Sequence, residues 1–558
     1  MSEALIDALR QAVGRRQVLT SPRRTERFRS SFRGAEGEAA AVVRPGTLLE
    51  LWRVLEASVA HGAVVIMQAA GTSLTDGSTP APGGYDRPVV IVNTLRIADI
   101  RLLRGGAQVV SFPGGTLYRL EDLLRPLGRE PHSVIGSSCI GASIVGGVCN
   151  NSGGSLVRRG PAYTELALYA EIDGGGRLRL VNHLGIRLGD TAEEMLRRLQ
   201  RGDFNDDDIE DGGGPASDGD YASRVRQINE PSASRYNADP TLLHEASGCG
   251  GKLAVFAARL DTFRSAGPEQ VFYAGTNDPA VLTGLRRAIL GEMSSLPIAG
   301  EYMHRDLFDM TRRYGKDTFV IIHHLGTGVM PAFFALKGRV DGWLHRLGFL
   351  PHKFSEHLLQ SLMSLWPEVL PKRLLDYRDR FAHHLMLRVA GDGVAEMEAL
   401  LARTFATGEG AYFKATADEG KRAFLHRFAA AGATARYALV KGQELLPLDI
   451  ALRRNDRDWF ETLPPEIEAD LDHKLYYGHF LCHVFHQDYV LKRGADGHAV
   501  KARMLALLRD RGAEYPAEHN VGHLYEAPPA QRSFFRALDP TNSFNPGIGK
   551  DSRRRDYA

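Results

Sequence analysis

One short stretch, MQAAGTSLTDGS at residues 67–78, constrains the fold more than any other part of this chain. It follows the apolar run HGAVVI, which is typical of a strand, and five consecutive small residues run from Ala69 to Ser73. Such residues make a poor core and a poor helix, but they let backbone N–H groups come close to a bound anion. The stretch therefore indicates a loop after a strand whose backbone contacts a ligand.

A second glycine-rich stretch, HSVIGSSCIGASIVGGVCNNSGGS, follows at residues 132–155. Residues 67–78 match neither the G-x-G-x-x-G nor the G-x-x-x-x-G-K-[ST] phosphate-binding pattern. For one such loop taken alone, a tight turn between strands is the better explanation. Two of them, both following strands in one α/β domain, favour the pyrophosphate of a dinucleotide.

The rest of the chain indicates more than one domain, because 558 residues exceed what a single core holds. Strands and helices alternate from about residue 40 to 170, TLLELWRVLEASVAHG is a helix capped by Thr47, and LAVFAARLDTF alternates like a strand. The net charge of +2 gives no argument for nucleic acid, and four cysteines suit a reducing compartment. With neither a signal peptide nor about eighteen consecutive apolar residues, the expected compartment is the cytoplasm.

Histidines gather in two further motifs. YYGHFLCHVFHQDYV contains His479, His483 and His486, and AEHNVGH contains Glu518, His519 and His523. If residues 476–490 form a strand, His479 and His483 share a face, whereas on a helix all three histidines share one. Imidazoles and a carboxylate that converge in this way suit a divalent metal ion. Ordinary hydrogen bonds of scattered histidines explain the spacing equally well.

Longer strings carry a resemblance to a known family. QAAGTSLTDGS, REPHSVIGSSCIGASIVGGVCNNSGGSLVRRGPAYTE and SGCGGKLAVFAARLDTF closely resemble the respiratory, quinone-linked, FAD-dependent D-lactate dehydrogenases of bacteria, within the flavoprotein superfamily typified by vanillyl-alcohol oxidase. The resemblance continues in EYMHRDLFD, RAFLHRFAAAGA, LDIALRRND, LPPEI, HKLYYGHF, YPAEHNVGHLY and DPTNSFNPGIGK, so it covers nearly the whole chain.

The resemblance implies an α+β fold with a vanillyl-alcohol-oxidase/PCMH-type FAD-binding domain, an α/β cap domain and an inserted, mainly helical membrane-binding segment. The implied FAD-binding domain spans residues 1–268 and is rejoined by 513–558. The cap, or substrate, domain spans 269–303 and 389–512, and the basic membrane-attachment segment spans 304–388.

The resemblance also assigns the FAD-contacting residues. They are Ala69, Ala70, Gly71, Thr72, Ser73, Gly77, Ser78, Gly136, Ser143, Gly153 and Val255. The family often has Asn-Thr-Gly where this chain has Gly71-Thr72-Ser73, so the residues stay small. Since no His or Cys lies in a motif that would link the flavin, we expect noncovalent FAD.

For the chemistry, the resemblance implies that His479, His486 and Glu518 bind a divalent metal and that His519 takes the hydroxyl proton. Arg427 matches the arginine that clamps the substrate carboxylate, with Arg453 and Arg454 as weaker candidates. The family's Asp-Gly-Asn between the two metal histidines is replaced here by the region around Cys482-His483-Val484-Phe485.

The implied reaction is oxidation of D-lactate to pyruvate, with electrons passed to a membrane quinone. One alternative is another D-2-hydroxy acid such as D-2-hydroxyglutarate, and others are a non-catalytic flavin-binding protein or a basic scaffold.

The basic segment contains apolar side chains framed by cations. These are Trp343, Leu344, Leu347, Phe349 and Leu350 among Arg339, His345, Arg346 and Lys353. The pattern suits a helix that inserts shallowly into anionic lipid, or one packed on its own core. The resemblance favours insertion into lipid. It implies a peripheral protein on the cytoplasmic side of the inner (plasma) membrane. The implied partners are D-lactate, a membrane quinone and an anionic lipid surface, with no nucleic acid.

Overall fold

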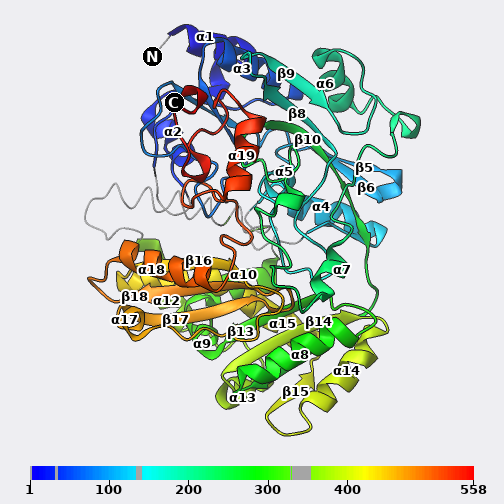
Figure 1. The fold of residues 1–558 in the computed structure, drawn as a ribbon, viewed down its shortest axis with the longest axis vertical. Helices are drawn as coiled ribbons and strands as arrows, with labels where there is room; N and C mark the ends of the chain where they lie inside the picture. The colour runs from blue at the N-terminus through cyan, green and yellow to red at the C-terminus, as the bar shows by residue number, and fades with distance from the viewer. Residues whose placement is uncertain (1–2, 32–35, 134–140, 327–328, 330–332, 334–353) are drawn as a thin grey trace.

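The computed structural model describes residues 3–31, 36–133, 141–326, 329, 333 and 354–558. Figure 1 shows a first lobe built from the N-terminal half, a second lobe built from the green-to-orange part of the chain, and a C-terminal tail that returns to the first lobe. Gly136 and the predicted lipid-facing residues 339–353 lie outside the described residues.

The first lobe begins with a four-stranded sheet in the order β1-β2-β4-β3. Its strands are β1 (Val18–Leu19), β2 (Ala41–Val43), β4 (Val89–Asn93) and β3 (Val64–Gln68), and its helices are α1 (Glu3–Val13), α2 (Pro22–Arg29) and α3 (Leu48–Ala60). β4 pairs in parallel with both β2 and β3. As predicted, α3 starts after Thr47, whose hydroxyl accepts the Glu50 N–H.

An antiparallel five-stranded sheet follows in the order β5-β6-β10-β8-β9. Its strands are β5 (Ile100–Leu103), β6 (Gln108–Ser111), β10 (Ala254–Asp261), β8 (Ala167–Ile172) and β9 (Leu178–Asn182), and β7 (Arg129–Glu130) pairs with β11 (Phe263–Arg264) beside it. Further helices of this lobe are α4 (Leu117–Leu124), α5 (Ile144–Cys149) and α6 (Ala192–Arg201), whereas α7 (Tyr221–Arg226) packs in a core of the second lobe. The strand predicted from LAVFAARLDTF is β10.

The second lobe is built on an antiparallel seven-stranded sheet in the order β15-β12-β14-β13-β17-β18-β16. The strands are β12 (Glu269–Thr276), β13 (Ala299–His304), β14 (His383–Ala390), β15 (Gly410–Lys414), β16 (Leu445–Ala451), β17 (Leu471–His479) and β18 (Val484–Leu491). Alternate side chains of the strands enter two separate cores, one on each face.

Helices cover both faces of this sheet. One core includes side chains of α8 (Pro279–Glu292), α14 (Gly393–Thr404), α17 (Pro465–Glu468) and α18 (Gly497–Asp510). The other includes side chains of α9 (Arg305–Tyr314), α10 (Lys316–Leu325), α13 (Lys372–Arg380), α15 (Ala417–Phe428) and α16 (Ala430–Lys441). α12 (Phe354–Ser364) lies next to α10 and α16. No helix in the described part of the chain is long and apolar enough to cross a bilayer.

Residues 476–490 form a hairpin, so the prediction of one strand or one helix was wrong. β17 ends at His479, a 3-10 turn spans Phe480–Cys482, and β18 starts at Val484. The turn closes through His483, whose φ is 55°. Because Tyr477 is the register partner of His486, His479 and His486 lie near each other across the two strands.

The C-terminal tail, which follows α19 (Pro529–Leu538), completes the first lobe. The Val65 N–H donates to the Ser543 carbonyl, and the Asn545 N–H donates to the Val65 carbonyl. The Asn545 amide also donates to the carbonyls of Gly77 and Gly250. The tail thus extends the edge of the parallel sheet at β3 and holds two loops in place.

Candidate functional site

The two glycine-rich stretches lie on one pocket in the first lobe. Of the predicted cofactor residues, Ala69, Ala70, Gly71, Thr72, Ser73, Gly77, Ser78, Ser143 and Val255 line it. The pocket holds about 1000 Å³ of empty space, a volume that includes open solvent. His519 also lines the pocket, although it is far from both loops in the sequence.

Side chains from the sheets fix the first of these loops. The Gln68 amide donates to the Ser78 carbonyl at 2.8 Å, and the Asn93 amide donates to the Ala69 carbonyl at 2.9 Å. Gly71 has a φ of 68°, and a β-carbon there would meet nothing within 4 Å, so backbone conformation and not crowding favours glycine. The second loop enters α5 through Ser143, whose hydroxyl accepts the Gly146 N–H.

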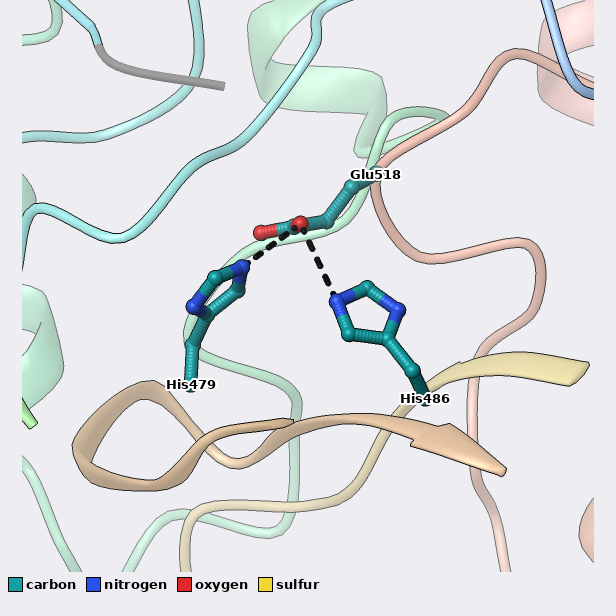
Figure 2. Close-up of side chains that lie close together, drawn as sticks. All are labelled: His479, His486 and Glu518. Carbon is teal, nitrogen blue, oxygen red and sulfur yellow. Dashed lines mark ion pairs between the residues drawn. The ribbon is translucent and has the colours of Figure 1, made fainter. Parts of the chain in front are cut away.

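The structure brings His479, His486 and Glu518 together (Figure 2). Glu518 Oε2 lies 3.1 Å from His479 Nε2 and 4.0 Å from His486 Nε2. One ligand atom from each residue falls within 4.8 Å of the others. The two histidines come from the hairpin, and Glu518 comes from the segment that leads back to the first lobe.

Two carboxylates that the sequence analysis did not assign orient the histidines from behind. Glu301 Oε1 lies 2.7 Å from His479 Nδ1, and Asp449 Oδ1 lies 3.3 Å from His486 Nδ1. Strand register explains both pairs, since Glu301 is opposite His479 and Asp449 is opposite His486. Asp449 Oδ2 also lies 2.7 Å from Nδ1 of His519. Both carboxylates lie in motifs given above, EYMHRDLFD and LDIALRRND. Only the order of the strands shows that they face His479 and His486.

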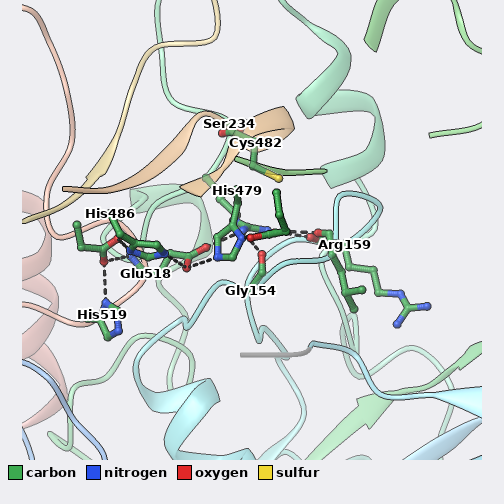
Figure 3. A network of polar contacts seen from close by, with 12 residues as sticks. Gly154, Arg159, Ser234, His479, Cys482, His486, Glu518 and His519 are labelled. Atoms are coloured by element: carbon green, nitrogen blue, oxygen red, sulfur yellow. Dashed lines mark hydrogen bonds and ion pairs between the residues drawn. The ribbon is translucent and has the colours of Figure 1, made fainter. Parts of the chain in front are cut away.

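Arg235 is a further residue that the sequence analysis missed. Its guanidinium donates to Glu518 Oε1 at 2.6 Å and to the Gly154 carbonyl, and the residue is 1% exposed. It therefore ties Glu518 to Gly154 in the second glycine-rich stretch. Figure 3 shows Glu518 and Gly154 in one polar network with the histidines. No motif around Arg235 signalled this contact.

Gly153 belongs to the polar cluster and does not line the pocket. A β-carbon on Gly153 would come within 2.9 Å of Glu518 Cδ. The glycine is therefore required by the close approach of the Glu518 side chain.

Arg427 lies at the end of α15 and contacts Glu301, with Nη2 and Oε2 separated by 2.9 Å. Its guanidinium also packs 4.5 Å from the ring centre of Tyr477. The weaker candidates lie elsewhere, because Arg454 bonds to Ser232, Arg224 and Gln227. Arg453 offers its carbonyl to His483.

The two remaining motif histidines make ordinary hydrogen bonds. His483 Nδ1 lies 3.0 Å from the Arg453 carbonyl, and His523 Nδ1 lies 3.1 Å from the Gly547 carbonyl. Burial lowers the pKa of both side chains. These two histidines therefore make ordinary hydrogen bonds and do not join the candidate metal ligands.

The cluster is strongly charged although Glu518 is buried and both histidines are partly buried. Burial alone would lower the pKa of His479, but Glu301 and Glu518 outweigh burial and raise it to about 10. Burial would raise the pKa values of Glu301, Glu518 and Asp449, but neighbouring histidine and arginine side chains lower all three instead. The three carboxylates are therefore ionised at neutral pH.

The donor set fits a divalent metal. Two imidazole nitrogens and one carboxylate oxygen are common ligands, and a carboxylate behind each imidazole is the usual outer support. Glu301 and Asp449 occupy these outer positions on the Nδ1 side, which leaves Nε2 of each ring toward Glu518. A metal bound at Nε2 of His479 would replace the proton that Glu518 now attracts.

The chain is similar to known proteins over its whole length. A family model described as an FAD binding domain matches residues 39–177, and one described as D-lactate dehydrogenase, membrane binding, matches residues 271–557. The chain is 56% identical to a quinone-dependent D-lactate dehydrogenase of Escherichia coli, over 100% of this chain and 98% of that protein. It is 52% identical to the protein of the same name from Haemophilus influenzae, over 100% and 99%.

Solved structures show the same fold at low identity. p-Cresol methylhydroxylase with substrate bound matches with a TM-score of 0.60 and 13% identity, over 98% of this chain and 96% of that one. 4-Ethylphenol oxidase from Gulosibacter chungangensis matches with a TM-score of 0.59 and 12% identity, over 98% and 97%. The predicted vanillyl-alcohol-oxidase/PCMH-type α+β fold is confirmed.

Gly153→Ala tests the close approach between Gly153 and Glu518. We expect the added methyl group to strain the buried ion pairs by about 1–3 kcal/mol and to lower the melting temperature measured by scanning calorimetry. Gly174→Ala is the control, because a β-carbon there meets nothing within 4 Å. Equal melting temperatures for the two variants would contradict the expectation.

Proposed function

The chain belongs to the family of quinone-dependent D-lactate dehydrogenases, and from that premise we propose how its residues carry out the reaction. The protein is an FAD-dependent enzyme that oxidises D-lactate to pyruvate and passes the electrons to a quinone. The names of its relatives favour this reaction over D-2-hydroxyglutarate oxidation and over a non-catalytic flavin-binding role.

His519 carries the proposal, because it belongs to both parts of the site. It lines the pocket formed by the glycine-rich loops, and its Nδ1 lies 2.7 Å from Asp449 in the polar cluster. A neutral imidazole in this position takes the proton of the C2 hydroxyl. FAD, when bound, supplies the acceptor for the hydride that leaves C2.

Arg427 is proposed to bind the carboxylate of D-lactate. The residue is 7% exposed, and packing on Tyr477 together with the ion pair to Glu301 fixes its orientation. A held guanidinium selects a planar anion by paired hydrogen bonds. Binding the carboxylate orients the C2 hydroxyl toward His519.

His519→Gln tests the proton acceptor. We expect the variant to keep its flavin absorbance but to lose about 10²- to 10⁴-fold in the rate at which D-lactate bleaches that absorbance under anaerobic conditions. His473→Gln is the control, since His473 is on the same hairpin but contacts Tyr437. An unchanged bleaching rate in His519→Gln would rule out His519 as the base.

We further propose that His479, His486 and Glu518 hold a divalent metal. The carboxylates behind both imidazoles support this, as does the fit of the donor set. A metal there would act as a Lewis acid toward the oxygens of a 2-hydroxy acid.

Metal content tests that site independently of turnover. After loading with Mn²⁺ or Zn²⁺ and desalting, we expect about one equivalent in the native protein by mass spectrometry. Glu518→Gln should retain almost none, because an amide is a much weaker ligand, whereas His473→Gln should retain the native amount. A native protein without metal would show that the cluster is an ion-pair network alone.

The protein associates peripherally with a membrane, since it has the family's membrane-binding domain and no described helix crosses a bilayer. We propose an anionic, cytoplasmic membrane surface. Of the nine large apolar side chains exposed among the described residues, five are Leu325, Leu358, Leu362, Leu365 and Trp366. All five lie within the basic membrane-attachment segment 304–388, where apolar side chains could enter a lipid surface. The free cysteines Cys149, Cys249 and Cys482 suit a reducing compartment.

Vesicle binding tests this surface. We expect the double variant Leu362→Glu, Leu365→Glu to lose at least about tenfold in affinity for phosphatidylglycerol vesicles, because each leucine contributes roughly 1.5–3 kcal/mol on burial. The control is Leu123→Glu, Leu127→Glu in the first lobe, where both leucines are exposed. Equal losses in the two double variants would contradict the assignment, and binding to neutral vesicles as tight as to anionic ones would exclude the anionic preference.

A further inference from the structure

The carboxylate of Asp449 contacts three residues of the site. It lies on β16, opposite His486 on β18, and its Oδ1 is 3.3 Å from Nδ1 of that histidine. Its Oδ2 lies 2.7 Å from Nδ1 of His519 and accepts the backbone N–H of Glu518 at 2.8 Å. One carboxylate therefore meets two imidazoles and the backbone of a third site residue.

The backbone around Asp449 also holds the segment that carries His519. The Ala517 N–H donates to the Asp449 carbonyl at 3.0 Å, and the Asn237 amide donates to the His519 carbonyl at 2.6 Å. Asp449 itself belongs to a strand of the seven-stranded sheet. The position of its carboxylate is thus set by the sheet, and the segment 517–519 is placed relative to it.

This contact decides which nitrogen of His519 carries a proton. An ionised carboxylate only accepts hydrogen bonds, so Nδ1, which faces Asp449, must be the protonated nitrogen of the neutral ring. Nε2 is then the basic nitrogen. Without Asp449 the ring could adopt the other tautomer or rotate, and the basic nitrogen would no longer point in one direction.

We propose that Asp449 is the positioning residue of this enzyme, which orients His519 as the base. The proposal rests on the proposed function, because it assumes that His519 takes the proton. Asp449 acts through His519 and does not itself touch the substrate.

A double-mutant cycle on the FAD-loaded enzyme tests this role. Asp449→Ala, His519→Gln and the double variant are mixed anaerobically with D-lactate, and the rate constant of flavin bleaching is measured in a stopped-flow instrument across D-lactate concentrations. We expect Asp449→Ala to lower the limiting rate about 100-fold or more while the D-lactate concentration at half-saturation changes much less. In the His519→Gln background we expect no further loss, because the residue through which Asp449 acts is already absent.

The control is Asp261→Ala, which removes a part-buried carboxylate at the end of β10 that bonds to Gln108 and Ser217. It should bleach at the native rate. If Asp449→Ala does not retain FAD, Asp449→Asn, which keeps the side-chain volume, replaces it in the same cycle, with a smaller loss expected in the native background and again none in His519→Gln.

The outcomes separate the two proposals. A full bleaching rate in His519→Gln would overturn the base assignment and the role of Asp449 together. A slow His519→Gln with a native rate in the Asp449 variant would overturn only the role of Asp449. An equal loss from the Asp449 variant in both backgrounds would do the same, because it would show a general structural effect.

Discussion

The site depends on a chain of buried charges that neutralise one another. Arg427 pairs with Glu301, Glu301 with His479, His479 with Glu518, and Glu518 with Arg235. Removing one member would leave an uncompensated charge in a medium of low polarity, which costs far more than the pair gains. The alternation of acid and base therefore holds the hairpin, α15 and the returning segment at fixed distances from the first lobe.

The register of the antiparallel sheet brings these charged side chains together. Glu301, His479, His486 and Asp449 all lie on the sheet face that α9, α15 and α16 cover, and near one end of their strands. Register alone places each acid opposite its histidine. The same end of the sheet receives Glu518 and His519 from the segment that leads to the FAD pocket, so substrate chemistry and cofactor binding adjoin.

The sequence predicted those features that local patterns encode. Alternating hydrophobicity identified β10, the Thr47 cap identified the start of α3, and small residues identified the loops of the pocket. The family resemblance added the convergence of His479, His486 and Glu518. The domain boundaries and the functional roles of the site residues stay predictions.

What the sequence could not provide is pairing over long distances. The hairpin was missed because its turn has no glycine and is closed by His483 with a positive φ. Glu301 and His479 are 178 residues apart, and Arg235 and Glu518 are 283 apart. Periodicity carries no information on such contacts, because they follow from the order of strands in a sheet.

The returning tail has a consequence for how the protein is made. Asn545 holds Gly77 and Gly250 in place, yet it is synthesised 468 residues after Gly77. At 5–20 residues per second the ribosome needs roughly 25–95 seconds to cover that distance. During this time the nascent first lobe lacks the strand-like segment that borders β3, so its cofactor loops acquire their final support only once translation is nearly finished. A chain released early would carry every glycine of the pocket and still lack the residue that joins them.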